Sequence, residues 1–130
     1  KYGFNPKRKA LWKDGCLIPR LHEALISGAF IPARSNVMLI GDAAGLLLPI
    51  KFEGIGTALK SGLLAVDAIA EAAEHGKEAA GGYLQELKPI LEAIARLHEL
   101  NTGLTQQKKM GASDLSKAIR SAYEDTLKVT

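Results

Sequence analysis

The residues of this chain best suited to chemistry lie between positions 36 and 56, which read NVMLIGDAAGLLLPIKFEGIG. One carboxylate, Asp42, follows an apolar run over residues 37–40 and a glycine, and the next acid is Glu53. A carboxylate accepts hydrogen bonds from hydroxyls, so it suits a sugar or polyol chain better than a phosphate. A glycine-opened helix after Glu53 would offer free N–H groups to anionic oxygens. The pattern therefore predicts a nucleotide-like ligand site.

Plainer interpretations of the same residues remain open. Asp42 also suits a turn cap, with Gly41 and Gly45 serving only as turn glycines. Glu53 has two interpretations, an acid or base beside the ligand and a cap of the following helix, and we expect the cap.

The elements that must position these residues follow from periodicity. Residues 1–36 are broken too often by glycine and proline for long elements. Residues 37–40 are apolar on both faces, which is typical of a strand in a parallel sheet covered on both sides. From Gly54 the apolar period becomes helical, and we expect a helix that ends near Gly76. Its expected core stripe is Ile55, Ala58, Leu59, Gly62, Leu63, Val66, Ile69 and Ala70.

Further helices are expected toward the end of the chain. Residues 77–82 resemble a loop, and residues 83–100 form a helical pattern in which Pro89 predicts a kink or a new start. The sequence NTG at 101–103 is expected to end that helix. A last helix over 115–127 would be capped by Ser113 or Asp114. The expected stripe of the 83–100 helix is Leu84, Leu87, Leu91, Ile94 and Leu97.

Composition limits the function classes. The 130 residues suffice for one modest core, and a net charge of +3 is below what we expect of a nucleic-acid binder. Cys16 is the single cysteine, so no internal disulfide forms. No apolar run reaches the roughly 18 to 20 residues of a membrane span. The three histidines, His22, His75 and His98, lack metal-ligand spacing, and we expect them at the surface or half-buried.

Residues 37–69 resemble the second flavin-binding motif of a large flavoprotein group. That group includes the geranylgeranyl reductases, their relatives in electron transfer to quinones, and the aromatic-ring hydroxylases. The spelling is nearest to the geranylgeranyl reductases, since this chain has GDAAG at 41–45, Pro49, and EGIG at 53–56. The sequence AFIP at 29–32 also matches the lead-in of that family.

The resemblance implies a role for each matching residue. Asp42 would bind a ribityl hydroxyl of FAD, and Gly41 and Ala43 would let the backbone approach the ribityl and pyrophosphate groups. Pro49 would shape the loop beside the isoalloxazine ring. The start of the next helix would lie near the pyrimidine edge of the flavin, where its dipole favours negative charge, at Gly54, Ile55 and Gly56. The resemblance implies no catalytic residue and no metal ligand that we can assign.

The chain also departs from the family pattern. Lys51 and Phe52 stand where the family has a small residue, and we expect the lysine to face solvent rather than pair with flavin or substrate. The phosphate-binding G-x-G-x-x-G is absent from the sequence, since Leu59 stands where a third glycine would follow Gly54 and Gly56. We therefore expect the C-terminal third of such an enzyme. Its fold class would be α/β, with one or two strands plus mostly α-helices from the C-terminal part of a Rossmann-like FAD/NAD(P)-binding domain.

Three regions are expected: a lead-in from the substrate domain over 1–36, a strand and helix of the FAD-binding domain over 37–76, and a helical region over 77–130. The implied activity is flavin-mediated reduction of an isoprenoid double bond or electron transfer to a lipid quinone. The alternatives are a helical interaction module left from a flavoprotein, and an aromatic-ring monooxygenase. We expect a cytoplasmic location and self-association of the fragment. Trp12 and the basic residues around it have two interpretations, peripheral contact with a membrane and a solvated chain end, and we expect the solvated end.

Overall fold

The computed structural model describes Gly15, residues 20–106, Gly111, and residues 113, 114, 116, 117, 120, 121 and 124. Two thirds of these residues are helical, and the single sheet among them has two antiparallel strands. The predictions for Trp12, Cys16 and most of the 115–127 helix lie outside the described residues. The elements in chain order are α1 (His22–Ile26), β1 (Ala33–Arg34), β2 (Val37–Met38), a 3-10 helix η1 (Gly41–Ala44), α2 (Ile55–His75) and α3 (Ala80–Gln106).

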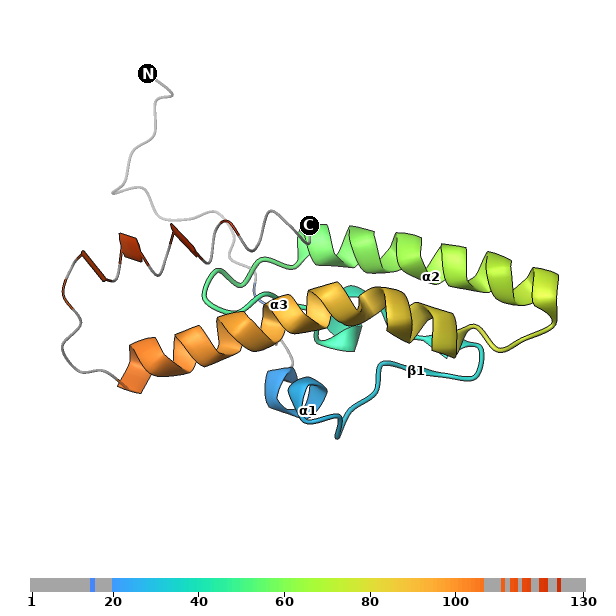
Figure 1. Ribbon diagram of the computed structural model, residues 1–130, viewed down its shortest axis with the longest axis horizontal. Helices are drawn as coiled ribbons and strands as arrows, with labels where there is room; N and C mark the ends of the chain where they lie inside the picture. Colours follow the sequence, from blue (N-terminus) through green and yellow to red (C-terminus); the bar gives the residue numbers. More distant parts are fainter. Residues whose placement is uncertain are drawn as a thin grey trace, which may run out of the picture.

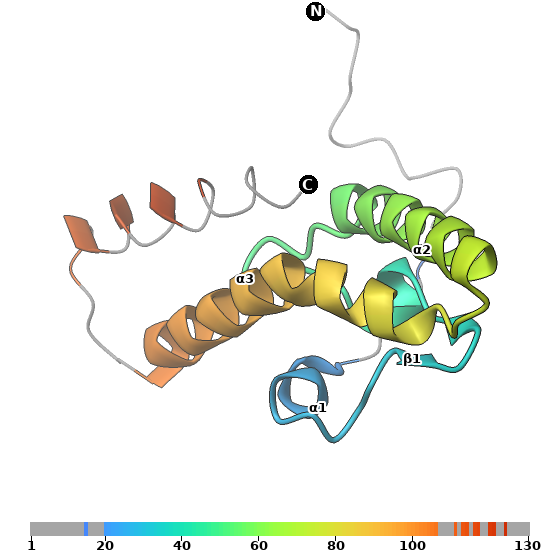
Figure 2. The same ribbon diagram turned by 45° about the vertical axis from the view of Figure 1, so that its right-hand side comes forward.

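Helices α2 and α3 form an antiparallel hairpin, and α3 is the central element of the fold (Figure 1). Helix α2 packs on one side of α3, whereas α1 and both strands contact it elsewhere (Figure 2). Helix α2 ends as predicted at Gly76, whose left-handed backbone (φ +61°) allows its N–H to reach the carbonyl of Ala72. The predicted helix limits are thus confirmed at both ends of α2.

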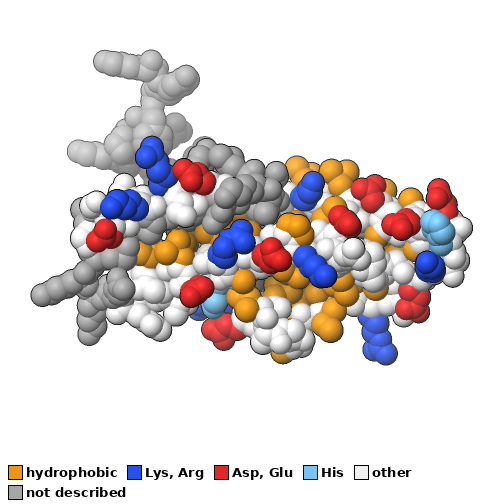
Figure 3. All heavy atoms as spheres, viewed as in Figure 1, with side chains coloured by type: hydrophobic (Ala, Val, Ile, Leu, Met, Phe, Trp, Pro, Cys, Tyr) orange, Lys and Arg blue, Asp and Glu red, His pale blue; other side chains and the backbone are white. Residues whose placement is uncertain are grey.

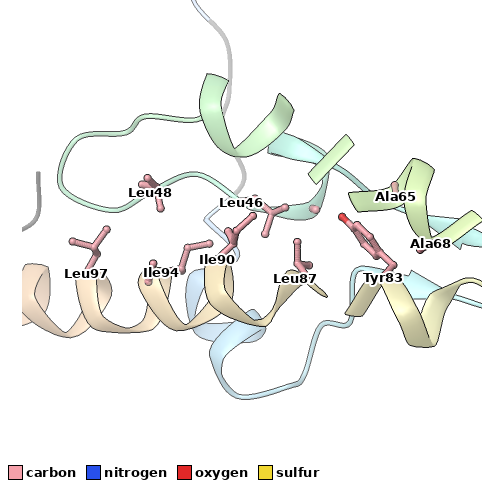
Figure 4. Close-up of a cluster of buried hydrophobic side chains, with 11 residues drawn as sticks. Leu46, Leu48, Ala65, Ala68, Tyr83, Leu87, Ile90, Ile94 and Leu97 are labelled. Atoms are coloured by element: carbon pink, nitrogen blue, oxygen red, sulfur yellow. The ribbon is translucent and has the colours of Figure 1, made fainter. Parts of the chain in front are cut away.

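The core lies between α3, the start of α2 and the loop that joins η1 to α2. Figure 4 shows Leu46 and Leu48 of this loop pointing toward α3, with Ala65 and Ala68 of α2 farther along. Helix α3 supplies the bulky side chains, and those that are essentially inaccessible to solvent are Tyr83, Leu87, Ile90, Ile94 and Leu97. Helix α2 contributes only the small residues Ala65 and Ala68 to this cluster of buried apolar side chains, and Leu64 packs against it partly buried.

The strand prediction for residues 37–40 was wrong in type and in burial. Val37 and Met38 pair with Arg34 and Ala33 in an antiparallel hairpin, whose two-residue turn has a positive φ of +53° at Ser35. Val37 is 67% exposed, so the run is not covered on both faces. A short apolar run has no periodicity to separate a buried parallel strand from a hairpin edge.

The predicted core stripe of α2 was also wrong. The large apolar residues on that stripe face away from α3 and are 50–79% exposed: Ile55, Leu59, Leu63, Val66 and Ile69. The buried face instead consists of Thr57, Ser61, Ala65 and Ala68. Figure 3 shows that apolar side chains remain visible between the charged ones on one face of the molecule, with acids gathered where α2 ends. We call the five exposed residues the outer stripe of α2.

Helix α3 is longer than predicted at both ends. It begins at Ala80 because the turn of the β-hairpin caps it: the Ala79 N–H donates to Asn36 Oδ1 at 3.1 Å, and the Ala80 N–H donates to the Ser35 carbonyl at 3.0 Å. The helix passes through Pro89 without a new start and through the NTG sequence to Gln106. None of the helices within the described part of the chain is long and apolar enough to cross a bilayer.

Candidate functional site

The GDAA sequence forms the 3-10 turn η1, which presents Asp42 to solvent. Gly41 and Gly45 bracket the turn in left-handed conformations, with φ of +53° and +71°. Backbone bonds from the Gly45 N–H to the Asp42 carbonyl and from the Leu46 N–H to the Gly41 carbonyl close it. Within the described residues the Asp42 carboxylate accepts no hydrogen bond, so the turn is held by its backbone and not by an aspartate cap.

Asp42 lies against the start of α2. A β-carbon at position 54 would lie 2.8 Å from Asp42 Oδ1 and 2.9 Å from Leu47 Cδ1, so a larger residue there would displace the Asp42 carboxylate or the Leu47 side chain. The carboxylate therefore stands beside the end of α2 whose first N–H groups lack intrahelical partners. A negative charge is favoured at this end of a helix. The structure thus places Asp42 against Gly54, two residues that the resemblance assigns to one ligand site.

Glu53 caps the same helix start, as we expected. Its Oε1 accepts a hydrogen bond from the Gly56 N–H at 2.8 Å. Its Oε2 is buried and has no hydrogen-bond partner among the residues that the structure describes. A buried carboxylate oxygen without a donor is costly, so a donor group from a ligand would stabilise it.

Two hydroxyls on the buried face of α2 hold the turn in place. Thr57 Oγ1 donates to the Leu46 carbonyl, and it lies 3.0 Å from the Gly54 carbonyl. Ser61 Oγ accepts the Gly41 N–H at 3.0 Å in a buried position. The sequence analysis missed both residues, although their sequence position offered a sign: they are polar residues with helical spacing on the face opposite the large apolar side chains.

Tyr83 of α3 completes this polar layer. Its hydroxyl donates to the Leu39 carbonyl at 2.7 Å, which fixes the segment that leads into η1. Burial raises the pKa of Tyr83 above its ordinary value of 10.0, and the hydrogen bond with Ser61 opposes that rise. The phenol therefore stays protonated and neutral around neutral pH.

The loop between η1 and α2 is tightly bent. Leu48 and Glu53 form an antiparallel bridge, with the Leu48 N–H donating to the Glu53 carbonyl at 2.8 Å. Ile50 and Phe52 take positive φ values of +74° and +51°, which are unusual for bulky residues. Pro49 is buried and the Phe52 side chain is 65% exposed. The Lys51 side chain is exposed, in line with the solvent-facing prediction.

The structure brings most of the predicted site residues to one place. Packing within the chain, however, already accounts for the glycine at position 41. A β-carbon at Gly41 would meet Ala58 Cβ at 2.8 Å, and the Gly41 N–H is bonded to Ser61. Gly41 therefore lacks a side chain because α2 lies against it. Its role in ligand approach stays a prediction, as does that of the exposed Ala43. The remaining predicted residues lie at the start of α2, where Ile55 is exposed and Gly56 half-buried.

A separate cleft is lined by the same loop, by α1 and by the last turns of α3. It encloses about 650 Å³ and brings His22 and His98 into contact, with ring centroids 5.8 Å apart. Both histidines are half-buried, as expected, but their proximity was not predictable from two positions so far apart in the sequence. No group of three or more metal-ligating side chains occurs in the described ranges.

Comparison of the chain with protein-family models, with curated proteins and with solved structures found no match.

Proposed function

We propose that this chain carries the second flavin-binding motif, and the helices after it, of an FAD-dependent oxidoreductase similar to the geranylgeranyl reductases. The observation that carries the proposal is the placement of Asp42. Its carboxylate is exposed, accepts no hydrogen bond from any residue that the structure describes, and lies against Gly54 at the start of α2. An aspartate that only capped a turn would have its oxygens bonded to backbone N–H groups.

The residues present fit an FAD molecule in three respects. The Asp42 carboxylate is available to a ribityl hydroxyl. The start of α2 offers N–H groups and a positive dipole end to the electron-rich edge of a flavin. Glu53 Oε2 is a buried acceptor that finds no donor in the described part of the chain, and a ligand N–H or O–H would supply one.

The chemistry would belong to the cofactor, and this part of the protein would bind and orient it. FAD supplies hydride or electron transfer, which suits reduction of an isoprenoid double bond or transfer to a lipid quinone. Asp42 would hold the polyol chain, and Gly54, Ile55 and Gly56 would present the helix start. In this proposal the chain belongs to a Rossmann-like FAD-binding domain, and the rest of that domain would cover the outer stripe of α2.

Substitution of Asp42 tests the proposal in the protein expressed from its complete reading frame. A hydrogen bond to a charged group contributes about 1.5 to 3 kcal/mol, so Asp42→Ala is expected to weaken FAD binding about ten- to a hundred-fold. Asp42→Asn is expected to have a milder effect, because the amide oxygen still accepts from a hydroxyl. The measurement is calorimetric titration of the apoprotein with FAD, together with its thermal melting.

The matched control is Asp67→Ala, which removes an exposed carboxylate from the middle of α2. It is expected to leave FAD affinity unchanged. If Asp42→Ala lowers the melting temperature by several degrees while FAD affinity stays the same, Asp42 is a structural residue and the flavin role is wrong.

The outer stripe of α2 favours a second candidate function, a helical interaction module. Five large apolar residues on one face of a helix, each at least half exposed, exceed the scattered apolar exposure of most monomers. In this second proposal another protein chain covers the stripe, and no flavin is bound.

Association of the chain tests this second candidate. Sedimentation is expected to show dimers or larger species that Leu59→Lys converts to monomers, because a lysine on the stripe opposes burial. Asp67→Lys, which adds the same side chain off the stripe, should leave the association intact. Two findings on the protein expressed from the complete reading frame would together exclude the interaction module and support the flavoprotein. The protein would be yellow, and Leu59 would be covered by its own chain.

A further inference from the structure

The cleft that contains His22 and His98 has the features of a small-molecule site of its own. Its walls come from α1, the Leu47–Phe52 part of the bent loop, and the last turns of α3. Its volume of about 650 Å³ lies in the range typical of ligand pockets. Of the residues assigned above to flavin, only Pro49 lines it. An inference about this cleft therefore does not depend on the proposed flavin function.

The lining of the cleft includes several polar side chains, from His22, His98, Arg20 and Asn101. His22 Nε2 lies 2.6 Å from the Leu47 carbonyl, and a carbonyl only accepts, so Nε2 carries the hydrogen. This bond fixes the ring of His22 against the loop and leaves Nδ1 for another partner. The His98 ring lies against it at an interplanar angle of 48°. Arg20 and Asn101 add donors to the same cleft.

The bent loop supplies the apolar part of the lining, and its backbone has an unusual conformation. Leu47, Pro49, Ile50 and Phe52 all contribute to the lining. Ile50 and Phe52 keep positive φ values, and such strain persists where the surroundings impose it, often at ligand-binding positions. The Phe52 side chain is 65% exposed, which leaves an aromatic surface at the mouth of the cleft.

The charges of the lining select the kind of polar head. Arg20 and Glu23 are its fully charged side chains, one of each sign. A doubly charged phosphate would meet Glu23 with strong repulsion, whereas a singly charged carboxylate matches the fork of a guanidinium group. The His98 imidazole and the Asn101 amide offer N–H donors to such a head. An apolar tail would lie against Ile50 and Phe52.

We propose that this cleft binds an amphipathic monocarboxylate, with its carboxylate at Arg20, His98 and Asn101 and its short apolar tail on the bent loop. The site is distinct from the start of α2, and it would recognise a small acid as substrate, product or regulator.

Titration of the chain with hexanoate tests the proposal, with hexanamide as the uncharged probe of the same shape. The readout is the change in chemical shift of each histidine ring signal in carbon–proton NMR spectra as the ligand is added. Hexanoate is expected to move the signals of His22 and His98 and to leave those of His75, at the far end of α2, unchanged. Because the carboxylate gains charge-assisted bonds, hexanoate should bind about ten-fold more tightly than hexanamide.

Variants assign the binding to the cleft. Arg20→Gln is expected to weaken hexanoate about ten-fold, whereas Arg34→Gln, which removes an exposed charge on β1, should have no effect. Phe52→Ala should weaken hexanoate but not acetate, which lacks the tail. Thermal melts confirm that each variant is folded, and the wild-type NMR titration stands without any variant.

Three results would overturn the proposal. Equal affinity for hexanoate and hexanamide would show that the cleft does not recognise an anionic head. Tighter binding of inorganic phosphate than of hexanoate would show that a monocarboxylate is not the preferred ligand. Histidine signals that do not move, or that move equally for His75, would show that hexanoate does not occupy this cleft.

Discussion

Two leucine-to-alanine substitutions on facing helices measure directly which side of α2 is buried. Leu63 lies on the outer stripe of α2 and is 64% exposed, whereas Leu87 of α3 is fully buried. Both residues lie inside long helices, so the change in helix propensity is the same and cancels in the comparison. The difference between the two variants therefore reports side-chain burial.

The magnitudes follow from these exposures. Full burial of a leucine side chain contributes about 1.5 to 3 kcal/mol, and Leu63 buries only about a third of its surface, so Leu63→Ala should cost at most about 1 kcal/mol. Leu87→Ala removes a side chain enclosed by the core and leaves a cavity, which costs about 2 to 5 kcal/mol. The free energy of unfolding of Leu63→Ala should thus exceed that of Leu87→Ala by at least about 1 kcal/mol.

Urea denaturation followed by circular dichroism provides the measurement. It is run at low protein concentration, since a second chain on the outer stripe would add to the cost of Leu63→Ala. Equal costs for the two variants at every concentration would refute the burial pattern of α2. They would instead support the pattern predicted from the sequence, in which Leu63 faces the core.

Two further substitutions test the polar layer beneath η1. Tyr83→Phe removes the bond to the Leu39 carbonyl and should cost about 0.5 to 1.5 kcal/mol near neutral pH. Because burial raises the pKa of Tyr83 above 10.0, the folded chain holds this proton more tightly than the unfolded chain, so the stabilisation is complete below about pH 10 and falls as the pH rises further. In urea melts, Tyr83→Phe should lack this part of the loss of stability at alkaline pH. An identical loss in the variant and the wild type would contradict the role assigned to the Tyr83 proton. Gly41→Ala places a β-carbon 2.8 Å from Ala58 Cβ at a φ of +53°, so thermal melts should show a loss of about 2 kcal/mol or more, and Gly81→Ala, where no atom lies within 4 Å, is the control that should not lose stability.

The sequence predicted those features that depend on local chemistry. Gly76 ends α2 because a left-handed residue is needed there, and glycine adopts that conformation readily. The GDAAG turn and the glycine at the start of α2 were found for the same reason. The capping role of Glu53 also follows from its position just before the helix. Each of these features depends on residues within a few positions of one another.

Features that depend on distant partners were not predictable. Helix α2 has two regular faces, one of large apolar residues and one of small ones such as Ser61 and Ala65. The periodicity of the sequence defines both faces equally well. The face of α2 that packs on α3 is selected by the bulky side chains of α3. The start of α3 depends likewise on Asn36, whose side chain accepts the Ala79 N–H from 43 positions away. The contact of His22 with His98 arises in the same manner.

The two faces of α2 connect the turn of Asp42 to the rest of the molecule. On the small face, Thr57 and Ser61 use their hydroxyls to fix the backbone on either side of η1. On the large face, the outer stripe begins at Ile55, immediately after the glycine that lies against Asp42. A surface that covers this stripe must therefore end next to the carboxylate. Under the flavoprotein proposal, the chain that buries the outer stripe is the same one that would close the ligand site above Asp42.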